Sequence, residues 1–143
     1  MAAESKATAH WEGALEDGRG TAKVDGGAIP EVEVTWQARV ERTSGTTSPE
    51  ELLAAAHAAC FCMAFAHQLD GDGNPPESLD SAVSVEFVPG EGVTSSRIEI
   101  RGRVPGLDQG AFEQAAATAH ENCPISGALR GNVEMSVEAT LES

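Results

Sequence analysis

A chain of 143 residues, 41% of them hydrophobic, fits a single domain over residues 1–143 with a core of its own. Its 23 acidic and nine basic residues give a net charge of −14, which repels nucleic acid and anionic membranes and argues against both as partners. No stretch reaches the about 20 apolar residues of a membrane span, and the first residues lack the apolar segment of a secretory signal, so we expect a cytoplasmic protein.

The first forty residues predict three strands. Residues 6–13 and 19–24 flank a Gly/Asp turn, which indicates a β-hairpin. Residues 31–41 alternate polar and apolar side chains, and this period of two predicts a half-buried strand. Arg39 is expected on the polar face of that strand.

A long apolar helix is predicted next. Ser48 is a good N-cap, Pro49 suits the first helical position, and Glu51 completes a capping box. The helix should run from about Pro49 to Leu69 and end at Gly71. Its middle is apolar on nearly all sides, so it belongs inside the protein or an oligomer. Because its many alanines permit close approach of a partner helix, we expect a dimer formed through it.

The rest of the chain returns to alternating patterns and then to helical ones, which makes the protein α+β with the predicted order β-β-β-α-β-β-α-α-β. The predicted elements are a second hairpin over 79–88 and 93–104, a helix over 108–122 capped by Asp108, a short helix over 123–131 started by Asn122, and a strand over 132–141.

Three cysteines, an odd number, do not form a disulfide framework in a chain without an export signal. Successive helical residues turn by about 100°, so Cys60 and Cys62 point about 200° apart and cannot serve one site. Cys62 is interpreted as a small buried hydrophobe. Cys123 stands where a helix begins, and free N–H groups there favour a thiolate. A packed cysteine beside a turn is the alternative interpretation.

Two H-x-x-C pairs, His57 with Cys60 and His120 with Cys123, have a spacing that can share one metal ion. A metal- or ligand-binding module built on these four residues is therefore one hypothesis, although the spacing alone is weak support. A small dimer without chemistry, whose cysteines only fill the core, is another.

Arg39 and Glu50 are the remaining candidates. An arginine can hold a thiolate in its charged form and bind a peroxide oxygen, and a carboxylate can orient that arginine through a bidentate pair. The alternatives are a surface arginine and a glutamate that compensates the helix dipole. Composition does not separate these interpretations.

Taken together, these stretches resemble the OsmC/Ohr family of osmotically induced and organic hydroperoxide resistance proteins. Residues 48–66, "SPEELLAAAHAACFCMAFA", resemble its first-cysteine helix, and residues 123–129, "CPISGAL", resemble its second-cysteine motif. Residues 9–21, "AHWEGALEDGRGT", and the segment that carries Arg39 also match. The resemblance covers essentially the whole chain, and "HWEG" and "AAHAAC" favour the OsmC branch.

The resemblance implies two antiparallel sheets around central helices in an intertwined homodimer. It also implies thiol-dependent reduction of organic hydroperoxides to alcohols, in oxidative or osmotic stress defence, without metal, haem or flavin. Cys60 is then the peroxidatic cysteine and Cys123 the resolving one, and the two form a disulfide. Arg39 activates Cys60 and Glu50 holds Arg39.

The same resemblance gives no catalytic role to Cys62 or His120, which weakens the metal hypothesis. Thiolate is the nucleophile, and burial in an apolar helix raises a thiol pKa, so a cation such as Arg39 is needed. A disulfide protects Cys60 from overoxidation, and a dithiol reductant must reopen it. Lipoyl-type dithiols are the reductant class that the resemblance implies for the Ohr branch. The apolar surroundings favour a substrate with an apolar tail.

Overall fold

The computed structural model describes residues 2–42 and 45–142. Contacts within the chain divide it into two compact units, Met1–Leu52 and Leu53–Ser143, and each is described by itself. The single domain over 1–143 stays a prediction. The mixture of two sheets and several helices confirms the α+β class.

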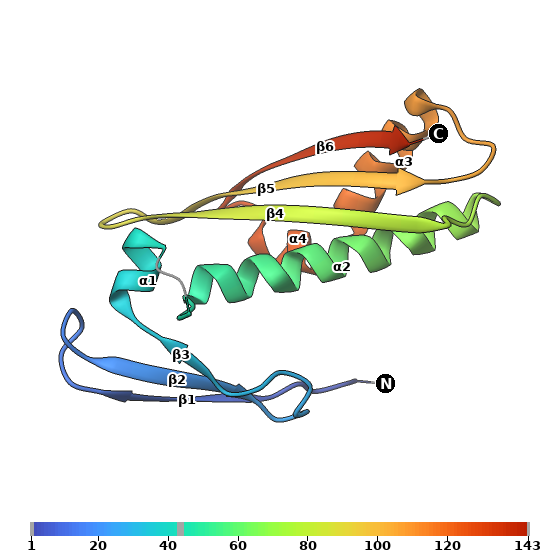
Figure 1. The fold of residues 1–143 in the computed structure, drawn as a ribbon. Helices are drawn as coiled ribbons and strands as arrows, with labels where there is room; N and C mark the ends of the chain where they lie inside the picture. Colours follow the sequence, from blue (N-terminus) through green and yellow to red (C-terminus); the bar gives the residue numbers. More distant parts are fainter. Residues whose placement is uncertain (1, 43–44, 143) are drawn as a thin grey trace. The chain divides into compact units, whose positions relative to one another are not determined.

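The first unit contains a three-stranded antiparallel sheet in the order β1-β2-β3 (Figure 1). Its strands are β1 (Ala7–Glu12), β2 (Arg19–Val24) and β3 (Val32–Val34). The pairing of β1 with β2 confirms the first predicted hairpin.

The strand predicted over 31–41 is wrong beyond Val34, because Trp36–Glu41 form a helix, α1. Thr35 adopts an extended backbone, and its hydroxyl accepts a hydrogen bond from the Ala38 N–H at 3.1 Å. This N-cap stabilises a helical turn that the alternating pattern did not indicate. Arg39 therefore lies in the last turn of a helix and not on a strand.

The long helix α2 (Pro49–Gly71) agrees with the prediction at both ends. The Glu51 N–H donates to the Ser48 hydroxyl at 3.1 Å, which confirms Ser48 as the N-cap. The Glu51 carboxylate accepts a hydrogen bond from the Thr47 hydroxyl at 2.6 Å. The first turn of α2 belongs to the first unit and the rest to the second.

By length and composition alone, α2 could cross a membrane, which the count of consecutive apolar residues had not indicated. Within the second unit, however, Phe61, Phe65 and Leu69 are buried in its hydrophobic core. A core helix of a soluble protein passes the same length and hydropathy test, so the structure is compatible with a soluble protein.

The second unit holds a three-stranded sheet in the order β4-β5-β6, beside which α2 runs (Figure 1). The strands are β4 (Ser78–Val88), β5 (Gly92–Arg103) and β6 (Glu134–Glu142). The antiparallel pairing of β4 and β5 confirms the second hairpin. The expectation of two antiparallel sheets is wrong here, because β6 pairs with β5 in parallel. The chain reaches β6 through a helical crossover, which is what a parallel neighbour requires.

That crossover consists of α3 (Gln109–Asn122) and α4 (Pro124–Leu129). The Asp108 carboxylate caps α3 as predicted, accepting from the Ala111 N–H at 2.8 Å. The N-cap of α4 is Cys123 and not Asn122, so the two helices meet at this cysteine. The stripe predicted along α3 is buried, as expected: Phe112, Ala115, Ala116 and Ala119.

Candidate active site

Two cysteines meet inside the second unit. The Cys60 thiol on α2 donates a hydrogen bond to the sulfur of Cys123, at the junction of α3 and α4. Cys60 is half-buried, whereas Cys123 is 1% exposed, and both are free thiols. This contact joins two motifs that lie about sixty residues apart in the sequence, and it places two sulfur atoms where a disulfide could close.

The pKa values of the two thiols are shifted in opposite directions. Burial raises the pKa of Cys60, the hydrogen bond to Cys123 raises it further, and the backbone N–H of Ile125 acts in the opposite direction. Burial also acts to raise the pKa of Cys123. Four hydrogen bonds to its sulfur outweigh the effect of burial, so the pKa of Cys123 is lowered. They come from the backbone N–H and the hydroxyl of Ser126, from the Cys60 thiol and from the Ile125 N–H. Within the second unit, Cys123 is therefore the more acidic of the two thiols.

A buried polar network surrounds this pair. The ring of His57 is 0% exposed, with Nδ1 2.7 Å from the Ser96 hydroxyl and Nε2 2.8 Å from the Ser126 hydroxyl. The Ser126 hydroxyl also lies 3.1 Å from His120 Nδ1. Burial lowers the pKa of both imidazoles, and their proximity lowers that of His57 further.

The two histidines thus meet at a serine hydroxyl. Both ring nitrogens of His57 already have serine partners, and a metal ion would have to displace one of them. Across residues 2–42 and 45–142, no group of three or more His, Cys, Asp or Glu side chains is close enough to hold a metal ion.

Cys62 has a different environment from Cys60, as the helical spacing predicted. Its thiol donates to the Ser81 hydroxyl on β4 at 3.2 Å, and that hydroxyl donates to the Ala58 carbonyl oxygen at 3.0 Å. Cys62 also packs against the hydrophobic core.

In the first unit, Arg39 and Glu50 form the predicted bidentate pair. The Arg39 Nε and Nη2 atoms each donate to one carboxylate oxygen of Glu50, both at 2.9 Å. The Glu50 side chain is 7% exposed and that of Arg39 30% exposed. A buried carboxylate that accepts two parallel hydrogen bonds fixes the plane of the guanidinium. This geometry corresponds to the orienting role expected of Glu50.

Arg39 also lines an apolar pocket of about 330 Å³ in the same unit. The other lining residues are Trp11, Leu15, Val34, Thr35, Trp36 and Pro49. The Trp11 ring packs directly on Gly20, where an added Cβ would lie 2.5 Å from the Cε3 atom of the ring. The pocket therefore offers one cation among aromatic and aliphatic groups, which suits a molecule with an apolar body and one polar end.

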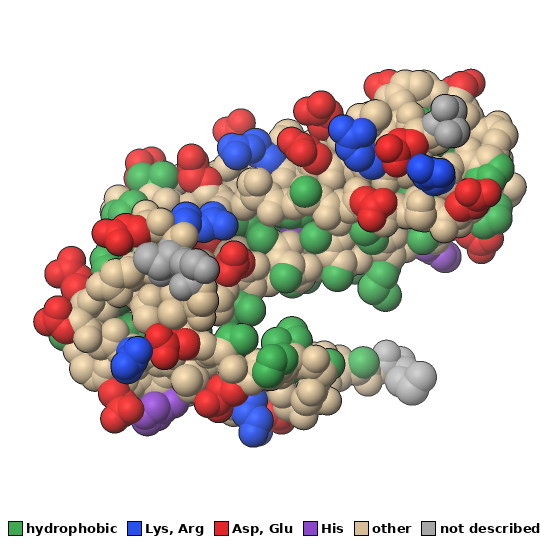
Figure 2. Space-filling model, in the orientation of Figure 1, with side chains coloured by type: hydrophobic (Ala, Val, Ile, Leu, Met, Phe, Trp, Pro, Cys, Tyr) green, Lys and Arg blue, Asp and Glu red, His purple; other side chains and the backbone are tan. Residues whose placement is uncertain are grey.

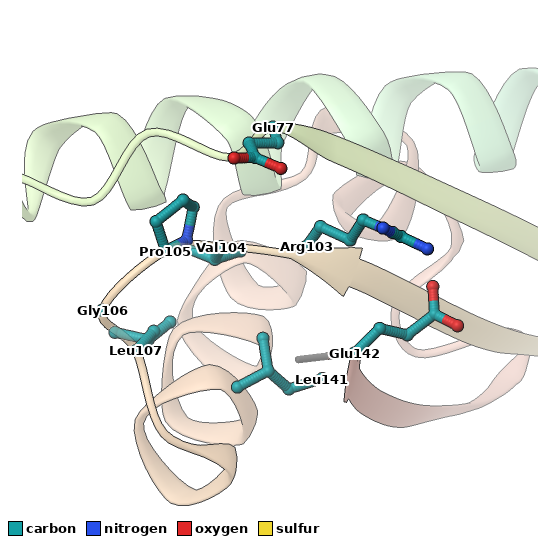
Figure 3. A pocket seen from close by; sticks show the side chains of 8 residues that line it. All are labelled: Glu77, Arg103, Val104, Pro105, Gly106, Leu107, Leu141 and Glu142. Atoms are coloured by element: carbon teal, nitrogen blue, oxygen red, sulfur yellow. The ribbon is translucent and has the colours of Figure 1, made fainter.

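Another pocket, of about 410 Å³, lies in the second unit near the end of β5 (Figure 3). Its polar lining side chains are Glu77, Arg103 and Glu142, and its other lining residues are Val104, Pro105, Gly106, Leu107 and Leu141. These lining residues include neither a thiol nor an imidazole, so this pocket offers no group for thiol chemistry.

The surface carries the acidity expected from the sequence. Asp and Glu side chains are spread over the face seen in Figure 2, with a few Lys and Arg side chains among them. Met63 of α2 stands out as an apolar side chain that is 74% exposed.

Of the four predicted site residues, the structure pairs Cys60 with Cys123 and Arg39 with Glu50, each pair within its own unit. Sequence reasoning missed Ser96 and Ser126. Ser126 lies inside the "CPISGAL" motif, so its position beside Cys123 was the one available signal.

Comparison with known proteins places the chain in a family. The family described as OsmC-like protein matches residues 42–138. The peroxiredoxin OsmC of Escherichia coli (strain K12) is 35% identical over 138 residues, covering 94% of this chain and 96% of that protein. An organic hydroperoxide resistance protein of Xanthomonas axonopodis pv. citri is 38% identical over 95 residues, covering 64% and 65%.

A solved structure shares the fold. The organic hydroperoxide resistance protein OsmC of Legionella pneumophila superimposes with a TM-score of 0.72 at 28% identity, covering 96% of this chain and 97% of that one. The match to more than half of the chain, together with a relative of 35% identity over nearly its whole length, shows the family. This chain belongs to the family of OsmC-like proteins.

Proposed function

We propose that this protein is a thiol peroxidase that reduces organic hydroperoxides to alcohols, with Cys60 as the peroxidatic and Cys123 as the resolving cysteine. The observation that carries the proposal is the hydrogen bond between these two thiols. Relatives named as a peroxiredoxin and as hydroperoxide resistance proteins support the same reaction class. Its place would be in oxidative or osmotic stress defence in the cytoplasm.

The proposed reaction has three steps. The Cys60 thiolate attacks one peroxide oxygen, the O–O bond breaks, and the sulfur is oxidised to a sulfenic acid while the alkoxide takes up a proton and leaves as the alcohol. The Cys123 sulfur then attacks the Cys60 sulfur, and an S–S bond forms as hydroxide takes up a proton and leaves as water. A dithiol reductant reduces this disulfide back to two thiols and is itself oxidised. Lipoyl-type dithiols are the reductant class proposed from the family resemblance.

The first step needs a Cys60 thiolate, which the second unit alone disfavours because burial raises the pKa of Cys60. Its S–H points to Cys123, and the S–H proton must leave before the attack. We assign to Arg39 the charge that then stabilises the Cys60 thiolate, with Glu50 orienting it. A guanidinium keeps its charge in any environment that the chain offers.

The proposed substrate class follows from the pocket beside Arg39. A guanidinium can bind a peroxide oxygen, while Trp11, Leu15 and Trp36 can cover an apolar tail. Hydrogen peroxide has no tail to fill about 330 Å³. An organic hydroperoxide therefore fits this pocket better than hydrogen peroxide.

A homodimer is part of the proposal. Ala55, Ala56, Ala59 and Met63 of α2 are exposed, although the helix is apolar and rich in alanine. Small exposed side chains along a helix allow another helix to approach closely.

The deciding experiment measures loss of an organic hydroperoxide in the presence of a dithiol reductant. The unmodified chain should turn over, and Cys60→Ser should not. Cys62→Ser is the matched control, because it removes a thiol from the same helix that contacts Ser81 instead of Cys123. A Cys60→Ser variant with near-normal turnover would refute the proposal. Stoichiometric zinc in protein purified without chelator would favour the metal-binding hypothesis instead.

A further inference from the structure

A serine hydroxyl joins the resolving cysteine to two histidines. Ser126 hydrogen bonds to Cys123 through both its backbone N–H and its hydroxyl, and that hydroxyl also meets His57 Nε2 and His120 Nδ1. His57, Ser96 and Ser126 are each 0% exposed. A buried polar group without a partner is costly, so each proton in this network must have an acceptor.

Counting donors and acceptors fixes the direction of the bonds. A hydroxyl has one proton and two lone pairs. If the Ser126 proton goes to a Cys123 thiolate, both imidazoles must donate to the Ser126 oxygen. A neutral His57 that donates from Nε2 must accept at Nδ1, and the Ser96 hydroxyl at 2.7 Å supplies that hydrogen bond. This arrangement gives every donor and acceptor of the His57 ring and the Ser126 hydroxyl a partner.

The charges around the network are compatible with it. Burial lowers the pKa of His57 and His120, so each is neutral at neutral pH and carries a single N–H. Arg130 lowers the pKa of His120 further, and Glu121 opposes that effect. From α2, the Cys60 S–H also points to Cys123. β5 contributes the Ser96 hydroxyl.

We propose that the Ser126 hydroxyl donates to Cys123 and holds it as a thiolate, with His57 and His120 as positioning residues that orient this hydroxyl. The catalytic consequence rests on the proposed function. The Cys123 thiolate attacks the Cys60 sulfenic acid, an S–S bond forms, and hydroxide leaves as water after taking up a proton from solvent. The network therefore acts on disulfide formation and not on the attack of Cys60 on the peroxide.

The ionisation of Cys123 can be measured without any peroxide. In a Cys60→Ser/Cys62→Ser background Cys123 is the one remaining thiol, and the chain has no tyrosine, so ultraviolet absorbance of the thiolate reports on Cys123 alone. Ser126→Ala should lower its acid dissociation constant about tenfold or more, the usual contribution of a hydrogen bond to a charged group. Ser126→Thr keeps a hydroxyl and should retain most of the acidity of Cys123 that Ser126→Ala loses.

Ser81→Ala is the matched control, since it removes a serine hydroxyl of the same unit that lies beside residue 62 in the parent chain and not beside Cys123. An unchanged titration in Ser126→Ala, or an equal shift in Ser81→Ala, would overturn the proposal. If Ser126→Ala does not fold, the His57 variants decide. His57→Gln keeps a donor toward Ser126 and should leave the titration of Cys123 like that of the parent. His57→Leu removes this donor and should lower the acid dissociation constant of Cys123. Equal titrations of these two variants would overturn the proposal as well.

A second readout separates this inference from the proposed function. In the otherwise unmodified chain, Ser126→Ala should oxidise Cys60 at the normal rate but form the disulfide about tenfold more slowly, so that sulfenic acid accumulates and can be trapped. If the unmodified chain reduces no hydroperoxide, the proposed function fails, while the titration of Cys123 still decides the role of Ser126.

Discussion

Replacing Arg39 tests the charge assigned to activation of Cys60, but the structure shows that the replacement also has a cost in stability. Arg39→Met removes both hydrogen bonds to the Glu50 carboxylate, which is 7% exposed. Leaving a fully buried charge without its partner costs about 3–5 kcal/mol, whereas an exposed pair contributes about 0–1 kcal/mol. Because Arg39 itself is 30% exposed, we expect a loss of about 2 kcal/mol in the free energy of unfolding.

A second substitution separates stability from chemistry. In Arg39→Met/Glu50→Leu no charge is left behind, and replacement of an ion pair by apolar side chains is often neutral, so stability in urea unfolding should return to about that of the parent. Peroxidase turnover should stay about a hundredfold below the parent in both variants, as when one preorganised electrostatic group is removed from an active site. Recovery of turnover in the stable double variant would refute the role of Arg39 in catalysis.

Three further predictions concern other parts of the molecule. Burial holds the pKa of His57 below its usual 6.5, so the unfolded chain binds a proton more readily than the folded chain does. The free energy of unfolding should therefore fall as the pH drops below about 6.5. His57→Gln should reduce this loss, which urea unfolding at several pH values would measure. Met63→Glu places a charge on the exposed apolar side of α2 and should convert a dimer to monomers in sedimentation experiments. Ala117→Glu, which adds the same charge at an exposed position of α3, is its control, and equal behaviour of the two variants would argue against this interface. Trp11→Ala enlarges the pocket beside Arg39 and should raise the KM for a bulky organic hydroperoxide more than the KM for hydrogen peroxide. An equal change in both KM values would show that this pocket does not bind the substrate.

Much of the site could be predicted because its key residues lie in local motifs. Cys60 and Cys123 each stand in a helix-related motif, and the helical spacing alone separated Cys60 from Cys62. Arg39 was identified as a partner of Glu50 even though its element was predicted wrongly. The Thr35 cap explains that error, because one hydroxyl at the start of a short segment outweighed the alternation of the following side chains.

The parts that escaped prediction depend on contacts between distant segments. Ser96 and Ser126 lie 39 and 69 positions from His57 in the sequence, and no periodicity indicates that their hydroxyls meet its ring. The spacing of the two H-x-x-C pairs suggested a metal site, whereas packing placed Ser126 between His57 and His120. The parallel pairing of β6 was missed for the same reason, since a strand's own pattern does not reveal the direction of its neighbour.

The proposed function requires that Cys60 and Cys123 act as one redox pair. It is tested most directly by mass spectrometry of unreduced peptides after addition of one equivalent of an organic hydroperoxide. We expect a Cys60–Cys123 disulfide, absent in Cys123→Ser, where Cys60 should instead stop at sulfenic acid and proceed to sulfinic acid only when a second equivalent is added. Three unmodified thiols, or a disulfide that involves Cys62 in place of Cys123, would contradict it.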